Sequence, residues 1–264
     1  MSPPNISLLP SRNYSDLPPF ERADVLGVTV GIFTRHRVTS LLRECLDSGV
    51  RGWISYINVN TLNIAYDQPW FRLFLNNSLF TYCDGQGVRL GAAILGKSLP
   101  ERIVMSDWIY DVCEASVARG LRLYLLGSTK DSLAQAIINL KQLYPDIQIV
   151  GSHHGYFSEL EGELVTQSIA RLNVDILIVG MGMPLQEEWI LRYYDRLNAR
   201  VILNAGSCFD YVSGFKKRCP VWMGIMGLEW VYRLAQEPGR LWKRYLLGNP
   251  LFLFRIIASR LERK

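Results

Sequence analysis

Two short strand-like runs, each closed by a glycine-containing turn, constrain this 264-residue chain more than any other feature. Ile176–Val179 ends on Gly180-Met181-Gly182, and Arg200–Leu203 ends on Asn204-Ala205-Gly206-Ser207. Runs without polar alternation predict strands that are buried on both faces, as in a parallel sheet. Ligands bind outside the carboxyl ends of such strands. The stretch 174–214 therefore predicts both a sheet type and the edge of the sheet at which a site lies.

The rest of the chain alternates strand-like and helix-like runs, a pattern that predicts a mostly parallel sheet with helices on both faces. The expected strands are Val25–Phe33, Trp53–Val59, Leu79–Cys83, Leu121–Leu126 and Ile147–Val150. The expected helices are His36–Ser48, a short or kinked one at Pro69, Val88–Leu95, Ser106–Ala118 with Ser106 as N-cap and Gly120 as stop, Asp131–Tyr144, Glu159–Leu172 and Pro184 to Asn198. The fold class is therefore α/β.

After Gly214 the sequence becomes basic and rich in large apolar side chains. Residues 216–264 carry eleven Lys and Arg against three Glu, a net +8, so the preceding residues carry −3 of the total of +5. A segment of this kind often indicates a phosphate-rich partner. Pro238 and Pro250 predict a break into two or three short helices. The expected parts are a flexible N-terminal arm (1–20), an α/β domain (21–215) and a helical basic C-terminal appendage (216–264).

Composition excludes several other classes of protein. With 49% apolar and 20% charged residues, the chain has the composition of a folded protein. Met1–Phe20 lacks the apolar core of a signal peptide, and no uncharged apolar run reaches the ~18 residues of a membrane-spanning helix. Five scattered cysteines without a CxxC pair indicate reduced thiols in a cytosolic protein rather than a disulfide frame or a zinc site.

Three short motifs resemble ligand-binding sequences but have simpler interpretations. Gly91–Ser98 matches GxxxxGK[ST], yet a helix precedes it where a phosphate-binding loop needs a strand. Gly127-Ser128-Thr129 lacks the spacing of a dinucleotide fingerprint, so an ordinary strand-to-helix turn is about as good an interpretation as a ligand contact. Adjacent His153 and His154 are expected to point apart, and no DxD carboxylate clamp occurs in the chain. We therefore expect no metal site.

Two aspartates follow strand ends at glycine-containing turns. Asp84 lies beside Gly85 and Gly87, which let a substrate approach the backbone closely. Asp210 follows the turn at Gly206. Each aspartate could act on a substrate or cap the following helix, and the residues alone leave both interpretations open.

Six motifs occur in an order that resembles one known family. They are Thr61-Leu62-Asn63, Cys83-Asp84-Gly85, Pro100-Glu101-Arg102, GMGMPLQE at 180–187, GSCFD at 206–210 and GLEWVYR at 227–233. Over about Val25 to Leu247 the chain resembles the WecG/TagA/CpsF glycosyltransferases, and the pair GxPxQE and GLEWxYR carries most of the specificity. The resemblance implies a Rossmann-like fold of the GT-E type.

The resemblance also implies an activity and the residues that carry it. A UDP-activated sugar would pass, with inversion and without a cofactor, to a polyprenyl-diphosphate-linked saccharide at the inner face of the cytoplasmic membrane. Asp84 matches the general base and Thr61 a catalytic or orienting group. Residues that match substrate-binding positions are Asn63, Arg102, Gly182, Gln186, Glu187 and Asp210, joined by Arg233, Arg240 and Lys243 or Arg244 of an appendage that closes over the site. The chain departs from the family at Gly31, where members often carry an acidic residue, and at Cys83, where many have Pro.

Elementary chemistry agrees with this assignment. Inverting transfer needs a base for the acceptor proton and positive or N–H groups for the leaving diphosphate, which appendage arginines and helix N-termini would supply. Residues 216–264 would also lie on an anionic membrane surface or pack on the domain. A nucleic-acid partner is not expected, and a homo-oligomer is compatible with the sequence. Two other classes remain: a nucleotide-binding Rossmann domain with an oxidoreductase or regulatory role, and a non-catalytic membrane scaffold.

Overall fold

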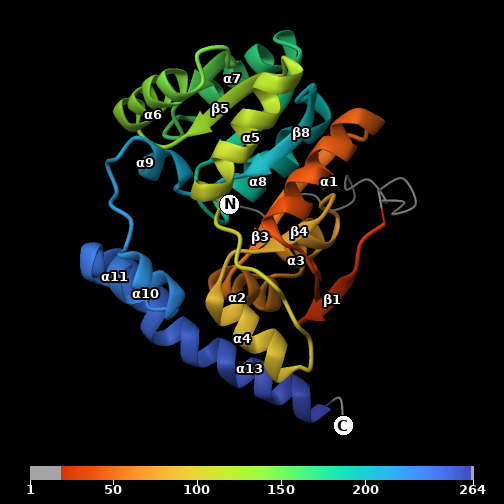
Figure 1. Cartoon of the computed structure of the whole chain (residues 1–264), viewed down its shortest axis with the longest axis vertical. Coiled ribbons are helices and arrows are strands. Elements are labelled where there is room, and N and C mark those ends of the chain that lie inside the picture. The colour runs from red at the N-terminus through yellow and green to blue at the C-terminus, as the bar shows by residue number, and fades with distance from the viewer. Residues whose placement is uncertain (1–18, 263–264) are drawn as a thin grey trace.

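A computed structural model describes residues 19–262, and its centre is a six-stranded parallel sheet in the order β4-β3-β8-β7-β5-β6 (Figure 1). The two runs that opened the sequence argument form the neighbouring strands β7 and β8, which confirms them as strands of one parallel sheet. The strands are β3 (Gly52–Ile57), β4 (Thr81–Cys83), β5 (Arg122–Gly127), β6 (Gln148–His153), β7 (Val174–Gly180) and β8 (Ala199–Asn204).

Helices cover both faces of the sheet, as the alternating sequence predicts. Successive residues of a strand point to opposite faces, so Ile176 and Ile178 of β7 join one buried apolar cluster and Leu177 and Val179 join the other. The first cluster lies under α1 (Arg35–Ser48), α5 (Met105–Arg119), α6 (Lys130–Leu143) and α9 (Cys208–Val212). The second lies under α2 (Val59–Asp67), α3 (Pro69–Asn76), α4 (Gln86–Ile94), α7 (Glu159–Arg171) and α8 (Leu185–Tyr193).

The prediction of one strand over Val25–Phe33 is wrong. The chain forms an antiparallel hairpin of β1 (Arg22–Val25) and β2 (Val28–Gly31), apart from the parallel sheet. Leu26 and Gly27 both have positive φ, 54° and 80°, which turns the chain back on itself after four residues. An apolar β-branched run does not reveal such a turn, because only Gly27 signals it.

Smaller differences concern the ends of elements. Helix α5 begins at Met105 with Val104 as N-cap, so Ser106 lies inside the helix, whereas Gly120 ends it in the left-handed conformation as expected. Helix α8 ends at Tyr193 and a 3-10 turn, η3 (Tyr194–Arg196), follows it, so the helix expected up to Asn198 is shorter. The expected break at Pro69 is present, because α2 ends at Asp67 and Pro69 is the first residue of α3.

The C-terminal part is a run of helices along one end of the molecule (Figure 1). Pro250 does not interrupt it, because this proline falls within the first turn of the 15-residue α13. A proline has no N–H to bond the carbonyl four residues earlier, and the preceding turn, η4, has widened to a π-helix in which Gly248 N–H bonds Lys243 O. The helices are α10 (Val221–Ile225), α11 (Glu229–Gln236), α12 (Pro238–Trp242), η4 (Lys243–Leu247) and α13 (Gly248–Glu262).

One face of α13 packs on α2 and α4 of the sheet domain. Phe252 and Ile256 are buried in the second apolar cluster, and Gly91 of α4 leaves the space into which Phe252 fits. Phe254, by contrast, is 69% exposed. Of the expected parts, the arm 1–20 lies almost wholly outside the described residues.

Candidate active site

A cavity of about 860 Å³ opens at the carboxyl ends of β3, β4, β7 and β8, and the C-terminal helices close its other side. Its place follows from the fold, because parallel strands end at one edge and present their turns there. Five arginines and two carboxylates line it, together with five large aromatic side chains. These residues are Arg102, Arg218, Arg233, Arg240, Arg244, Asp84, Glu229, Tyr56, Tyr211, Trp230, Tyr245 and Phe252.

Asp84 follows β4 directly and lines the cavity. Its N–H bonds the carbonyl of Ile57 at the end of β3, at 2.8 Å, which fixes the residue at the sheet edge. The N-cap of α4 is Gly85, without a side-chain capping bond in the described structure, so Asp84 is not the capping residue that one interpretation allowed. Burial raises the pKa of Asp84 to about 7, against the opposing effect of the nearby Arg102 guanidinium.

The arginines differ in how their charges are balanced. Arg102 pairs with Glu229 at 2.6 Å, and both side chains are less than one-fifth exposed. Arg240 pairs with Glu237 at 2.5 Å. Within residues 19–262, neither Arg233 nor Arg244 takes part in an ion pair, and Arg244 Nε is buried without a hydrogen-bond partner. Burial lowers the pKa of Arg244. Two guanidinium groups thus line the cavity without an ion-pair partner in the part of the chain that the structure describes.

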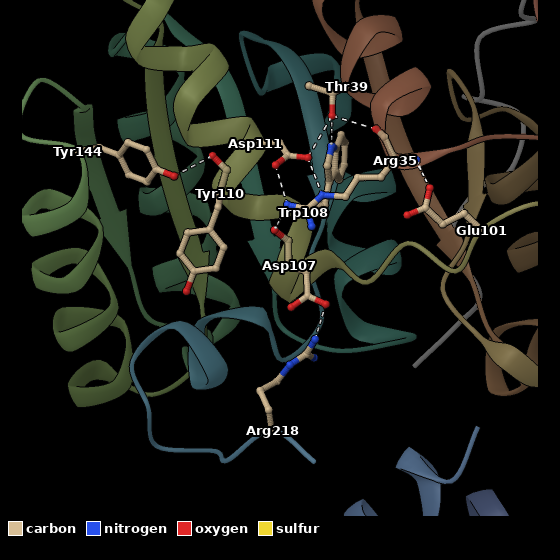
Figure 2. Close-up of polar contacts among 9 residues, drawn as sticks. All are labelled: Arg35, Thr39, Glu101, Asp107, Trp108, Tyr110, Asp111, Tyr144 and Arg218. Carbon is tan, nitrogen blue, oxygen red and sulfur yellow. Dashed lines mark hydrogen bonds and ion pairs between the residues drawn. The ribbon is translucent and has the colours of Figure 1, made fainter. Parts of the chain in front are cut away.

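Arg218 was missed as a site residue, although it ends the basic triplet before Cys219-Pro220. Its guanidinium bonds Ser106 Oγ at 2.8 Å and pairs with Asp107 at the start of α5. Figure 2 shows that the same Asp107 meets Arg35 of α1, whose Nη2 donates to the Asp107 carbonyl at 2.8 Å. Arg218 therefore holds the segment that leads into the C-terminal helices against α5, one of the helices over the first apolar cluster.

Six of the residues singled out by sequence do not line the cavity. Gln186 and Glu187 are buried beneath it, and Lys243 lies beside the Trp242 ring at 5.5 Å. The Thr61 hydroxyl donates to Asn58 Oδ1, at 3.1 Å, within the first turn of α2. The other two are Asn63 and Asp210.

Asn63 and Asp210 instead join parts of the chain. Asn63 Nδ2 donates to the Gly248 carbonyl at 2.8 Å, and its Oδ1 accepts from Arg255 at 3.1 Å, so it holds α13 on α2. The Asp210 carboxylate accepts from the Ser128 and Ser132 hydroxyls and pairs with Lys216 Nζ at 2.7 Å. It ties the turn after β5 to α9 and to the start of the C-terminal segment.

The ligand-like motifs also have defined places. Gly91 lies inside α4, as expected of a helix rather than a phosphate-binding loop, and Gly127-Ser128-Thr129 forms the turn from β5 to α6 away from the cavity lining. His153 and His154 do not point apart, since their rings lie 4.5 Å from each other. Among residues 19–262 no three His, Cys, Asp or Glu side chains gather to hold a metal ion. Nor, over that range, is any helix long and apolar enough to cross a membrane.

The arrangement can bind a diphosphate and remove a proton at neighbouring points. Guanidinium groups bind phosphate oxygens in a bidentate manner, and a buried carboxylate with a pKa near 7 can act as base or acid at neutral pH. Aromatic faces such as those of Trp230 and Tyr211 suit a sugar or a base.

Comparison with known proteins agrees with this geometry. The chain is 31% identical to an N-acetylglucosaminyldiphosphoundecaprenol N-acetyl-beta-D-mannosaminyltransferase of Bacillus subtilis (strain 168), over 85% of this chain and 86% of that protein. A protein with the same name from Staphylococcus aureus (strain MW2) is 29% identical over 90% of this chain and 93% of its own. The model of the glycosyl transferase family WecG/TagA/CpsF matches residues 23–264. The match spans nearly the whole chain, so the protein belongs to the WecG/TagA/CpsF family of glycosyl transferases.

Proposed function

We propose that the protein is an inverting glycosyltransferase that moves a sugar from a UDP-sugar to a polyprenyl-diphosphate-linked saccharide in bacterial surface polysaccharide biosynthesis. The observation that supports it best is the juxtaposition of Asp84 with Arg233 and Arg244, two guanidinium groups that form no ion pair within the described chain. The relatives' names point to a lipid-linked acceptor, N-acetylglucosaminyldiphosphoundecaprenol, and to an N-acetylmannosaminyl group as the first sugar to test.

In the proposed reaction the acceptor hydroxyl oxygen attacks the anomeric carbon of the donor. The bond from that carbon to the diphosphate oxygen breaks, and UDP leaves with the electron pair. Asp84 takes the hydroxyl proton, and Arg233 and Arg244 stabilise the charge on the leaving diphosphate. A beta-linked product, as in the relatives' names, requires inversion if the nucleotide sugar is α-linked.

Among the other residues of the resemblance, we assign ligand contact to those that line the cavity. Arg102, Gly182 and Arg240 meet this criterion. For Thr61 the geometry supports a positioning role, because its hydroxyl contacts Met183 Sδ at 3.5 Å and Met183 lines the cavity. Asn63 and Asp210 would act through the parts of the chain that they hold together.

We further propose that the protein works at the inner face of the cytoplasmic membrane. The C-terminal helices expose large apolar side chains beside Lys and Arg, a composition that suits the headgroup region of an anionic bilayer. The most exposed are Val221, Trp222, Ile225, Met226, Leu247, Phe254 and Leu261. Packing of the C-terminal segment on the domain, the alternative to membrane contact, applies to the other face of α13, where Phe252 and Ile256 are buried.

The direct test is a panel of UDP-sugars assayed against undecaprenyl-diphosphate-linked N-acetylglucosamine, scored by product mass. We expect one UDP-N-acetylhexosamine to give product, and transfer to persist in EDTA because arginines take the leaving charge. Loss of activity in EDTA, restored by Mg²⁺ or Mn²⁺, would contradict the arginine assignment. Tight NAD or ATP binding without turnover of any UDP-sugar would support the nucleotide-binding alternative instead.

A further inference from the structure

Gln186 joins the two turns that form the floor of the cavity. Its side chain is fully buried, and its Oε1 accepts from Gly182 N at 3.2 Å and from Gly206 N at 3.0 Å. Gly182 follows β7 and Gly206 follows β8, and both line the cavity. An amide oxygen has two lone pairs, so these two bonds use its whole accepting capacity. The oxygen therefore has no capacity left for a ligand.

Both turns need a tether because of their backbone conformations. Gly182 and Gly206 have φ of +81° and +55°, a region that glycine reaches freely and from which it departs just as easily. At Gly206 a side chain would also meet the Tyr56 hydroxyl, since a Cβ there would lie 2.5 Å from that oxygen. Glycine is thus required at this position, and the Gln186 side chain supplies the rigidity that glycine lacks.

Glu187 continues the same network inside the protein. Its Oε1 accepts from Gln186 Nε2 and from Asn204 Nδ2, both at 2.7 Å, and its side chain is 3% exposed. In the described structure, Glu187 Oε2 and Asn204 Oδ1 are buried acceptors without any donor. A buried carboxylate without a cation is very unfavourable, whereas a carboxylic acid brings one O–H donor into a place that lacks donors.

No charge near Glu187 offsets a carboxylate. No residue between 19 and 262 forms an ion pair with it. Arg72 of α3 lies against Gly27, and Arg196 of η3 pairs with Glu163. Arg192, on α8 itself, pairs with Glu159. The other titratable groups on α8 and the elements around it are Glu188, Tyr56, Asp175, Tyr193, Tyr194, Asp195 and Arg200, of which Arg200 pairs with Asp175.

We propose that Gln186 and Glu187 are positioning residues, which hold the turns after β7 and β8 as the floor of the cavity, and that Glu187 does so as the uncharged carboxylic acid. The identity of the ligand above this floor rests on the proposed function, whereas the hydrogen-bond network does not depend on it. Burial raises the pKa of Glu187 to about 7, in agreement with an uncharged group at slightly acidic pH. The QE pair of the GxPxQE motif is thereby assigned to the support of the site rather than to its lining.

The first test measures the melting temperature of the full chain between pH 5 and 8. An acid that stays protonated in the fold but ionises in the unfolded chain makes stability fall as pH rises toward 7. Asp84 contributes in the same direction, so all variants carry Asp84→Asn. We expect Glu187→Gln to reduce the fall and the matched control Glu188→Gln, one residue away, to leave it unchanged. An undiminished fall in Glu187→Gln overturns the uncharged state.

The second test measures backbone hydrogen exchange in Gln186→Met, which keeps the side-chain length but accepts no strong hydrogen bond. We expect exchange at 180–184 and 204–208 to rise about tenfold or more, with β5 and β6 unchanged, because only the turn amides lose their acceptor. Unchanged exchange in those two turns, or a uniform rise over the chain, overturns the positioning role.

The third readout is transfer activity, and it separates this proposal from the proposed function. In the protein that retains Asp84, Glu187→Gln should keep kcat/KM within about threefold of the wild type, because the amide matches the shape of the acid. Glu187→Leu should lower kcat/KM about tenfold to a hundredfold, because it leaves the Gln186 and Asn204 amides without their acceptor. Loss of activity in Glu187→Gln with a folded chain overturns the proposal. If no UDP-sugar is turned over by the wild type, the proposed function fails, while the melting and exchange results still decide the role of the network.

Discussion

At the scale of residues, the site is defined by charges that the protein leaves incompletely balanced. Asp84 is a carboxyl group whose burial opposes ionisation, and Arg244 is a guanidinium group whose burial opposes its charge. Such groups cost stability unless something compensates them. A diphosphate that meets Arg233 and Arg244 would supply the missing counter-charge, which is why we place the leaving group there.

The Asp84→Asn variant tests the base. We expect it to keep the fold and donor binding but to lose about 10²–10⁴-fold in kcat, the usual effect of removing a general base. In the wild type, transfer should fall as pH decreases below about 7, because the base is then protonated, and the variant should lack this limb. Full turnover in Asp84→Ala would show that Asp84 is not the base.

Arg244 and Lys243 form a matched pair for the diphosphate site. Arg244 lines the cavity and Lys243 does not, although the two are adjacent and the sequence could not choose between them. We expect Arg244→Met to reduce kcat/KM about a hundredfold or more while the melting temperature stays level or rises, since an unpaired buried charge is removed. Lys243→Met should retain near-normal kcat/KM. Equal losses in both variants would argue for a general electrostatic effect.

At the scale of elements, the contact between α4 and α13 decides how the C-terminal helices close the cavity. Gly91 permits a close approach that any side chain would obstruct, because a Cβ there would lie 2.6 Å from Phe252 Cζ and 3.2 Å from Ile256 Cδ1. The π-turn η4 helps this approach, since it lets one continuous helical run pass Pro250 and still present Phe252 to α4.

Replacing Gly91 with Ala should therefore destabilise the docking of α13. We expect a loss of about 1–3 kcal/mol in the free energy of unfolding, typical of overpacking, together with faster proteolysis of the C-terminal helices. Gly239→Ala is the control, because no described atom lies within 4 Å of its Cβ position. Adding Phe252→Leu to Gly91→Ala should recover part of the stability. Identical stabilities of the Gly91 and Gly239 variants would contradict the packing argument.

At the scale of the whole molecule, the C-terminal helices lie at one end and α6 and α7 at the other (Figure 1). Both ends expose apolar side chains, for example Trp222 and Ile225 on α10 and Leu160 and Leu164 on α7. The net positive charge belongs to the C-terminal segment, because residues 216–264 carry +8 in the sequence and the preceding residues carry −3. Charge therefore distinguishes two surfaces that apolar exposure alone does not.

Vesicle sedimentation tests which end meets lipid. The wild type should bind vesicles containing anionic lipid and be released by high salt, because each Lys or Arg contributes about 1 kcal/mol that salt screens. Trp222→Ser with Ile225→Ser should weaken binding about tenfold or more, as apolar area is lost. The matched pair Leu160→Ser with Leu164→Ser, at the far end, should bind as the wild type does. Equal weakening by both pairs would contradict a specific membrane face.

Much of the fold could be inferred from local patterns. The buried strands, the break at Pro69 and the place of Asp84 at a strand end follow from periodicity and turn residues, whose effect reaches only a few positions along the chain. The same patterns failed between β1 and β2, where the turn lacks a strong sequence signal. They also failed at Pro250, which lies in the first turn of α13 and does not break the helical run.

The composition of the site could be inferred only in part. Asp84, Arg102 and Arg233 were found from motifs, but Arg218, Tyr56 and Tyr245 enter the cavity from segments far apart in the sequence. The sequence order could not show that Gln186 lies beneath the cavity while Gly182, four residues earlier, lines it. Periodicity is a local property and determines which segments form strands and helices, whereas the side of a turn that faces a ligand depends on packing against distant elements, and that packing exists only in the folded chain.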